Sequence, residues 1–215
     1  MSAGARTVGE ALRAAAARLG AGGSDTARLD AEVLLAWVLG GERTLLITRR
    51  DVALDDARAA RFDALLERRL AGEPVAYLTG EKEFFSLVFA VDRRVLIPRP
   101  ETEQLVEFVF ARLPDEEIRI LDVGTGSGII AISLALKRPK YHVTAVDLSP
   151  DALELAAANA AKLSAKVDFL ASDLLPAGKD PFHAIVANLP YIPSEEIPGL
   201  SREVQKDPLT ALDGG

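Results

Sequence analysis

The amino-acid sequence predicts an α/β fold built on a parallel sheet. From Ile118 onward, short apolar runs alternate with longer segments of helical periodicity, a pattern typical of strands joined by crossover helices. Ser149 and Pro150 supply an N-cap and a first-turn proline for one of these helices. The expected strands lie near residues 118–123, 141–147, 166–171 and 182–187, and the expected helices near 127–138 and 150–164.

The first third of the chain has the apolar periodicity of helices. Thr7 and Glu10 have the spacing of a capping box ahead of an Ala-rich helix. A second helix is expected to open at Ser24 and Asp25, and another is expected to follow Asp55. The expected apolar faces of these two helices consist of Leu29, Val33, Leu34, Trp37 and Val38, and of Phe62, Leu65, Leu66 and Leu70.

A β-hairpin is predicted to link the helices to the sheet. Apolar residues alternate between Phe84 and Ile97, and Asp92-Arg93-Arg94 is the expected turn. A proline-rich segment then starts a helix that runs to about Leu113. The expected domains are therefore a helical domain at residues 1–80, a hairpin linker at 81–100 and a larger domain at 101–215.

The composition restricts the kinds of chemistry that the chain can carry out. It contains no Cys, which excludes disulfides, zinc-thiolate sites and thiol nucleophiles. The only two His residues lie in separate apolar segments, so no metal site is expected. No apolar stretch is long enough to span a membrane, and the N-terminus lacks the pattern of a signal peptide. We therefore expect a cytoplasmic protein with no membrane partner.

Charge is distributed unevenly along the chain. Residues 1–100 contain 15 Lys and Arg against 14 Asp and Glu, whereas residues 101–215 contain 10 against 18. Neutralisation of phosphates supplies most of the affinity of proteins for nucleic acids. An acidic sheet domain would repel that backbone, so no stable nucleic-acid partner is expected.

A glycine-rich turn follows the first predicted strand and precedes a helix. Glycines are required where the backbone turns tightly and approaches a ligand closely. The spacing here is G-x-G-x-G rather than the G-x-G-x-x-G of dinucleotide sites, so it suits a sulfonium nucleoside that carries no phosphate. The cofactor contacts expected at this turn are Asp122, which would influence the cationic end of the ligand, and Gly124, Thr125, Gly126, Ser127 and Gly128.

Carboxylates also follow the next two predicted strands. Asp147 ends the second strand, where a carboxylate can accept hydrogen bonds from both ribose hydroxyls, and Leu148 is beside it. Asp173 follows the third strand and could meet the amine edge of adenine, with Leu174 flanking the ring. Ligands of open α/β sheets bind at the carboxyl ends of successive strands, so these residues predict one nucleoside site.

Asn188-Leu189-Pro190-Tyr191 follows the fourth predicted strand. A nitrogen conjugated to a carbonyl or a ring is a poor nucleophile, so catalysis must orient its lone pair and favour the charge that develops on it. The Asn188 side-chain oxygen and a backbone carbonyl at Leu189 or Pro190 can accept its hydrogen bonds. Tyr191 can stack on the planar group. These four residues are the candidate catalytic set of a nitrogen methyltransferase.

These segments together resemble the HemK/PrmC family of protein-glutamine methyltransferases. The resemblance extends over nearly the whole chain and includes Pro74–Gly80, Leu96–Glu103, Ile120–Gly128, Val146-Asp147, Ser172-Asp173 and Asn188–Tyr191. It implies a Rossmann-like class I methyltransferase sheet that uses S-adenosylmethionine. It also implies, as substrate, the glutamine of the Gly-Gly-Gln loop in class I peptide-chain release factors. Finally, it implies a substrate-docking role for the helical domain, and a position for Arg99 and Pro100 beside the cofactor.

Two positions depart from the family pattern and leave alternatives open. Leu189 stands where the family usually has proline, which adds a backbone N–H and reduces rigidity. Asn-Leu-Pro-Tyr also resembles ribosomal RNA adenine dimethylases, so a methyltransferase of the adenine amine in RNA or DNA is the alternative. Relatives often have an aromatic residue where this chain has Leu174.

The segment that follows Tyr191 resembles the part of the family that precedes a further helix and further strands. We therefore expect the sheet to be incomplete at its C-terminal side, with the fourth strand at an edge. Such a chain would bind cofactor weakly, and a non-catalytic cofactor-binding module is the second alternative. A monomer is expected.

Overall fold

The computed structural model describes residues 6–178 and 181–215, which divide into two compact units. The first unit extends to Thr79, and the second begins at Gly80. The β-hairpin belongs to the second unit. In the described part of the chain, no helix is long and apolar enough to cross a membrane.

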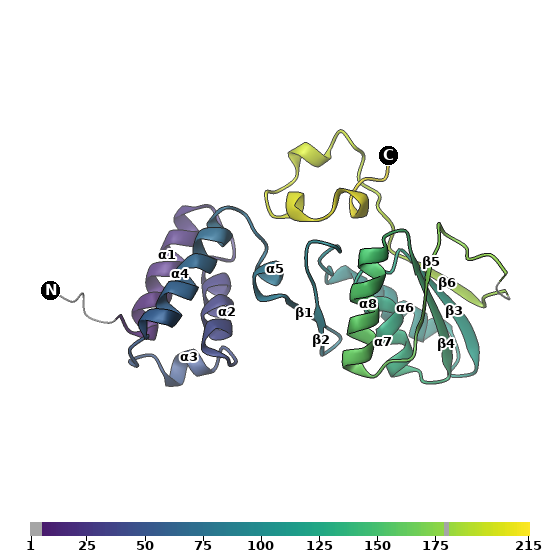
Figure 1. The fold of residues 1–215 in the computed structure, drawn as a ribbon, viewed down its shortest axis with the longest axis horizontal. Helices are drawn as coiled ribbons and strands as arrows, with labels where there is room; N and C mark the ends of the chain where they lie inside the picture. The colour runs from purple at the N-terminus through teal and green to yellow at the C-terminus, as the bar shows by residue number, and fades with distance from the viewer. Residues whose placement is uncertain (1–5, 179–180) are drawn as a thin grey trace. The chain divides into compact units, whose positions relative to one another are not determined.

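The first unit is a small helical bundle (Figure 1). Thr7 and Glu10 form the predicted capping box, and the Asp55 side chain accepts a hydrogen bond from the Arg58 backbone N–H. Leu34, Leu35 and other fully buried side chains fill the space between the helices. The helices are α1 (Val8–Ala21), α2 (Ala27–Leu39), α3 (Leu45–Thr48), α4 (Asp56–Leu70) and α5 (Val75–Thr79).

Helix α2 differs from its prediction at its N-terminus. It begins at Ala27, and the hydroxyl groups of Ser24 and Thr26 donate to the Asp30 carboxylate instead of capping the helix. The Arg69 guanidinium of α4 also donates to Asp30, at 2.8 Å, and both side chains are nearly buried. Leu29 is 44% exposed, so its predicted place on the buried face is wrong. Asp30 occupies the inward-facing position of the helix, so the preceding residue, Leu29, points toward solvent.

Asp30→Ala should destabilise the first unit by about 3 kcal/mol, because it removes the carboxylate that faces a nearly buried guanidinium. Urea unfolding followed by the fluorescence of Trp37, the only Trp and a residue of α2, measures this change. The control Glu67→Ala breaks an exposed ion pair with Arg18 and should cost less than about 1 kcal/mol. Equal costs for the two variants would contradict the structural role of Asp30.

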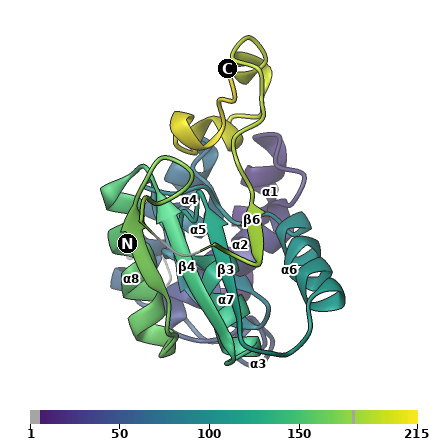
Figure 2. The same cartoon turned by 90° about the vertical axis from the view of Figure 1, so that its right-hand side faces the viewer.

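The second unit contains a four-stranded parallel sheet with the strand order β5-β4-β3-β6. Figure 2 shows β4, β3 and β6 side by side. The four predicted strands are confirmed, and β6 lies at an edge of the sheet. The elements are β1 (Glu81–Phe84), β2 (Leu87–Ala90), α6 (Glu101–Arg112), β3 (Ile118–Val123), α7 (Ile129–Lys137), β4 (Tyr141–Asp147), α8 (Pro150–Leu163), β5 (Asp168–Ala171) and β6 (Ala184–Ala187).

The turn of the hairpin does not lie where the sequence predicted it. Phe84 pairs with Leu87, so the turn consists of Phe85 and Ser86, both with positive φ. Asp92-Arg93-Arg94 forms a separate turn after β2, in which Asp92 accepts hydrogen bonds from Arg94. Burial decides the register, because the side chains of Phe84 and Phe89 both lie in the core of the unit. The usual turn residues, glycine and asparagine, are absent from this position.

The two faces of the sheet have different neighbours. Ile118 and Ile120 of β3 belong to a large apolar core shared with α6, α7 and α8. Leu121 and Val123 alternate with them and therefore lie on the opposite face, where Phe182 packs against a smaller cluster.

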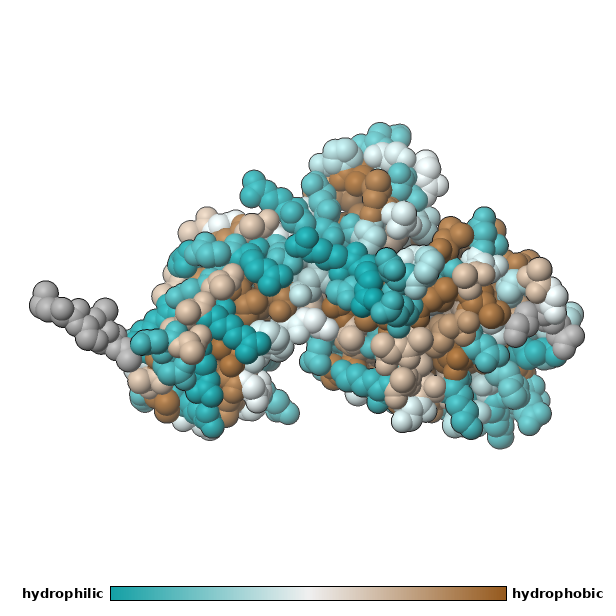
Figure 3. Space-filling view, in the orientation of Figure 1, coloured by the Kyte–Doolittle hydropathy of each residue, from teal (hydrophilic) through white to brown (hydrophobic). Residues whose placement is uncertain are grey.

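After β6 the chain forms a segment of short 3₁₀ turns. These are η1 (Ile197–Gly199), η2 (Val204–Lys206) and η3 (Leu209–Ala211). The segment returns to form a parallel bridge between Asp213 and Ile192. Figure 3 shows apolar surface on this segment, at the top of the view, and Leu209 is 60% exposed.

Candidate functional site

The strand register brings the predicted site residues to one edge of the sheet. Val123 of β3 pairs with Val146 of β4 and with Ala187 of β6. The residues that follow these three in the sequence are Gly124, Asp147 and Asn188. Because the strands are parallel, these three residues emerge side by side at their carboxyl ends.

The glycine turn has the backbone conformation that its sequence requires. Gly124, Gly126 and Gly128 all have positive φ, which residues with a side chain rarely adopt. A Cβ at Gly128 would lie 2.9 Å from Ile132 and 3.1 Å from Ala156, so this glycine allows α7 and α8 to pack closely. By contrast, only Val95, at 4.0 Å, comes near a Cβ built on Gly126.

Asn159, which the sequence did not single out, holds the turn against the hairpin. Its side-chain oxygen accepts from the Ala90 N–H at 2.7 Å, and its amide nitrogen donates to the Ala90 and Ser127 carbonyls. The residue is 1% exposed on α8. An Asn within an Ala-rich helix gives no sequence signal for such a role.

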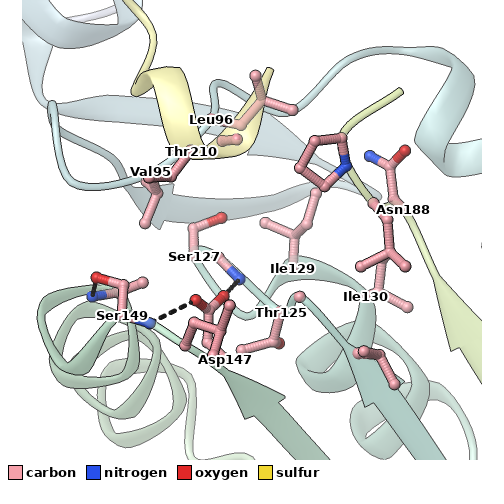
Figure 4. Close-up of a pocket in the computed structure, with 18 of the residues that line it drawn as sticks. Val95, Leu96, Thr125, Ser127, Ile129, Ile130, Asp147, Ser149, Asn188 and Thr210 are labelled. Atoms are coloured by element: carbon pink, nitrogen blue, oxygen red, sulfur yellow. Dashed lines mark hydrogen bonds between the residues drawn. The ribbon is translucent and has the colours of Figure 1, made fainter. Parts of the chain in front are cut away.

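Asp147 connects the glycine turn to the start of α8. One carboxylate oxygen accepts from the Gly126 N–H at 2.9 Å, and the other accepts from the Ser149 N–H at 2.9 Å (Figure 4). Each carboxylate oxygen can accept more than one hydrogen bond, so both retain capacity for a ligand hydroxyl.

A cavity of about 410 Å³ lies above this edge of the sheet. Figure 4 shows Asp147 and Asn188 on opposite sides of it. Its size lies within the range of about 300–1,000 Å³ typical of small-molecule sites. The predicted residues that line it are Gly124, Thr125, Gly126, Ser127, Asp147, Leu148, Asp173, Leu174, Asn188, Leu189 and Pro190.

Five predicted residues do not line this cavity, and one of them, Arg99, lines only a second cavity. Pro100 lies exposed at the start of α6, and Gly128 faces the packed helices instead. Tyr191 is 81% exposed and lines a second cavity. Asp122 is completely buried and does not line the cavity, so its predicted contact with a cationic ligand stays a prediction.

Asp122 instead supports the glycine turn from inside the protein. One of its oxygens accepts from the Thr125 hydroxyl at 2.7 Å and from the Ala131 N–H at 3.2 Å. Its other oxygen has no hydrogen-bond partner among the described residues. Burial raises the pKa of Asp122 to about 6, although the bonds from Thr125 and Ala131 act against this rise.

The cavity also has walls that the sequence did not predict. Val95, Leu96 and Pro98 come from the segment between the hairpin and α6, where the family resemblance was the available signal. Thr210 and Ala211 come from η3, which carries no recognisable ligand-binding pattern.

A second cavity of about 470 Å³ adjoins the first. Arg99, Glu101, Tyr191 and Val204 line only the second cavity. The two cavities share the residues Leu96, Thr102, Asn188, Leu189, Pro190 and Ala211. The Asn188–Pro190 loop therefore borders both cavities.

Comparisons with known proteins agree with this arrangement. Residues 10–80 match the PrmC N-terminal domain, and residues 102–201 match the methyltransferase small domain. These matches define the second unit as a methyltransferase domain.

Comparison with individual proteins over most of this chain is more specific. The release factor glutamine methyltransferase of Moorella thermoacetica is 48% identical, over 97% of this chain and 75% of the relative. The enzymes of Escherichia coli strain K12 and Koribacter versatilis are 47% and 45% identical, over 94% and 97% of this chain and 73% and 76% of their own lengths. The chain belongs to the family of release factor glutamine methyltransferases.

The burial of the Asp122 carboxyl predicts that the free energy of unfolding depends on pH. The unfolded chain ionises this group near its ordinary pKa of 3.8, whereas the folded chain ionises it only near 6. Stability is therefore lost as pH rises between these values and is constant above them. Because Asn does not titrate, Asp122→Asn should gain up to about 3 kcal/mol relative to the parent protein between pH 4 and 7.

Urea unfolding followed by circular dichroism, to which both units contribute, measures this difference in stability. Trp37 fluorescence reports the unfolding of the first unit in the same samples, so that the transition of the second unit can be identified. A stability difference between Asp122→Asn and the parent that does not change with pH would contradict the burial of an ionisable carboxyl.

Proposed function

We propose that this chain transfers a methyl group from S-adenosylmethionine to the side-chain amide nitrogen of the glutamine in the Gly-Gly-Gln loop of class I peptide-chain release factors. The observation that carries the proposal is the pair of cavities that meet at Asn188–Pro190. A donor in the first cavity and an acceptor in the second would meet where the two cavities share this loop.

The residues of the first cavity fit the proposed cofactor. Asp147 and Asp173 suit a ligand that carries hydroxyl groups and positive charge, and they would repel a pyrophosphate. Gly126 leaves room for the amino-acid end of the ligand, and Leu148 and Leu174 offer apolar surface to its base. When bound, S-adenosylmethionine supplies an electrophilic methyl group on a positively charged sulfur.

Asn188 is suited to hold the acceptor amide. Within the described ranges, no hydrogen bond engages its side chain, and the residue is partly exposed between the two cavities. Its oxygen, together with the backbone carbonyl of Leu189 or Pro190, would accept the two amide hydrogens and direct the nitrogen lone pair at the methyl carbon. Methyl transfer would form an N–C bond in place of the C–S bond of the donor, and the proton that the amide nitrogen then releases would pass to solvent. The exposed ring of Tyr191 would stack on the amide plane.

We further propose that the helical unit docks the release factor and that the chain works as a monomer in the cytoplasm. The match of residues 10–80 to a domain specific to this family supports the docking role. The excess of acidic residues after position 100 supports a protein substrate rather than a stable nucleic-acid partner.

Radiolabelled S-adenosylmethionine tests the substrate directly. The purified chain should label a release factor, and it should not label the same protein with Glu in place of the glutamine of its Gly-Gly-Gln loop. Ribosomal RNA and DNA, offered separately, should remain unlabelled. Label in adenine would favour the nucleic-acid methyltransferase instead. Cofactor binding without transfer to any of these substrates would favour a non-catalytic module.

Substitutions at the two sides of the loop should separate catalysis from cofactor binding. Asn188→Ala should lower kcat about 100-fold, because it removes an acceptor that stabilises developing charge. Asp147→Ala should instead weaken the binding of S-adenosylhomocysteine about tenfold or more, because it removes a charged acceptor. Single-turnover methylation and isothermal titration measure these two quantities.

The exposed Glu116→Ala variant serves as the control and should change neither quantity. Normal kcat in Asn188→Ala would exclude the proposed role of the amide. Unchanged affinity in Asp147→Ala would exclude a ribose contact at that carboxylate.

A further inference from the structure

Hydrogen bonds hold the segment after β6 to the site at two separate places. The first is Asp207, whose side chain is completely buried. One of its oxygens accepts from the Arg99 guanidinium at 2.6 Å, and the other accepts from the Ile97 N–H at 3.4 Å. These bonds hold the segment against the stretch that precedes α6, whose residues line both cavities.

The second place is the stretch directly after the Asn188–Tyr191 loop. The Ile192 N–H donates to the Leu212 carbonyl at 3.1 Å, and the Gly214 N–H donates to the Ile192 carbonyl at 3.0 Å. The Asp213 carboxylate also accepts a hydrogen bond from the Ser194 hydroxyl at 2.7 Å, which adds a side-chain contact to the backbone bridge between Ile192 and Asp213.

Gly214 touches the loop through backbone atoms alone. A Cβ at this position would lie 2.9 Å from the Tyr191 Cα and 3.0 Å from the Pro190 carbonyl oxygen. Neither atom belongs to a side chain that could turn aside, so the backbone of the loop or of Gly214 would have to shift. The φ of Gly214 is not positive, so a side chain here would meet only this collision and no backbone strain.

We propose that Gly214 is a positioning residue for methyl transfer. It fixes the positions of the Pro190 carbonyl and of Asn188 where the two cavities meet. The inference rests on the proposed function and adds a role for a residue that lines neither cavity. Asp207 anchors the other end of the same segment.

Gly214→Ala tests the proposal, and Gly199→Ala is its matched control. Gly199 lies in the same segment and also lacks a positive φ, and a Cβ added to it would meet no described atom within 4 Å. Gly214→Ala should lower kcat about 100-fold, because small displacements of reacting groups have effects of this size. Its affinity for S-adenosylhomocysteine and its Tm should remain those of the parent, and Gly199→Ala should match the parent in all three.

A parent-like kcat in Gly214→Ala would overturn the proposal. A parallel loss of kcat, cofactor affinity and Tm would also overturn it, because that result describes a merely structural glycine.

Hydrogen exchange separates this inference from the proposed function. The Ile192 amide should exchange about tenfold faster in Gly214→Ala than in the parent, because its bond to Leu212 is displaced. This readout needs no substrate. If the parent methylates no release factor, the proposed function fails, while the exchange rate still decides whether Gly214 fixes the loop. Unchanged exchange at Ile192 would overturn the inference alone.

Asp207→Asn provides a second variant that adds no bulk. Asn can still accept from the Ile97 N–H, but it loses the charge that faces Arg99. Its kcat should fall about tenfold with cofactor affinity within about twofold, because a charge-assisted bond becomes a weaker neutral one. A kcat equal to that of the parent would show that the anchor does not position the loop.

Discussion

Strand β3 is hydrogen-bonded on both sides, to β4 and to β6, and this pairing determines which residues meet at the upper edge of the sheet. Val123 is level with Val146 and with Ala187. A shift of either neighbour by one residue would turn its side chains to the other face of the sheet. Asp147 would then leave the Gly126 amide that it binds, and Asn188 would leave the boundary between the cavities. Strand β3 is the central member of this arrangement, and Ile120 and Leu121 are both fully buried on its opposite faces.

Leu189 connects the two functional loops that this register brings together. Its side-chain Cδ2 lies 3.0 Å from the position that a Cβ on Gly124 would occupy. The residue that stands in place of the family's usual proline therefore packs against the glycine turn. The backbone of the loop is held separately, by the bridge between Ile192 and Asp213. Both contacts restrict the loop from outside, which offsets the freedom that the loss of a proline ring introduces.

The sheet and most of the first cavity could be predicted from the sequence, because their signals are local. Apolar periodicity marked the strands, and the residues just past each strand necessarily meet at one edge in a parallel sheet. Asp122 shows the limit of this reasoning. A carboxylate at a strand end suggests a ligand contact, but the side chain points into the core, where it orders Thr125 and Ala131. Strand direction alone did not reveal which face the side chain takes.

The remaining features depend on contacts between residues far apart in the sequence. The hairpin turn at Phe85-Ser86 follows from the burial of Phe84 and Phe89, not from turn chemistry. The partners Asp30 and Arg69 are 39 positions apart, and Asp207 and Arg99 are 108 positions apart. Neither pair has a spacing that could be recognised in advance. The role of η3 as a wall of the cavity has the same origin, because the long-range contacts of Asp207 and Asp213 return it to the site.

A crystal structure of the chain with S-adenosylhomocysteine and a peptide that contains Gly-Gly-Gln would test the account most directly. We expect the ribose hydroxyls on Asp147, the sulfur facing the Asn188–Pro190 loop, and the glutamine amide in the second cavity, in contact with Asn188 and next to the sulfur. A cofactor bound away from Asp147, or an amide that approaches from a side other than the second cavity, would contradict the account.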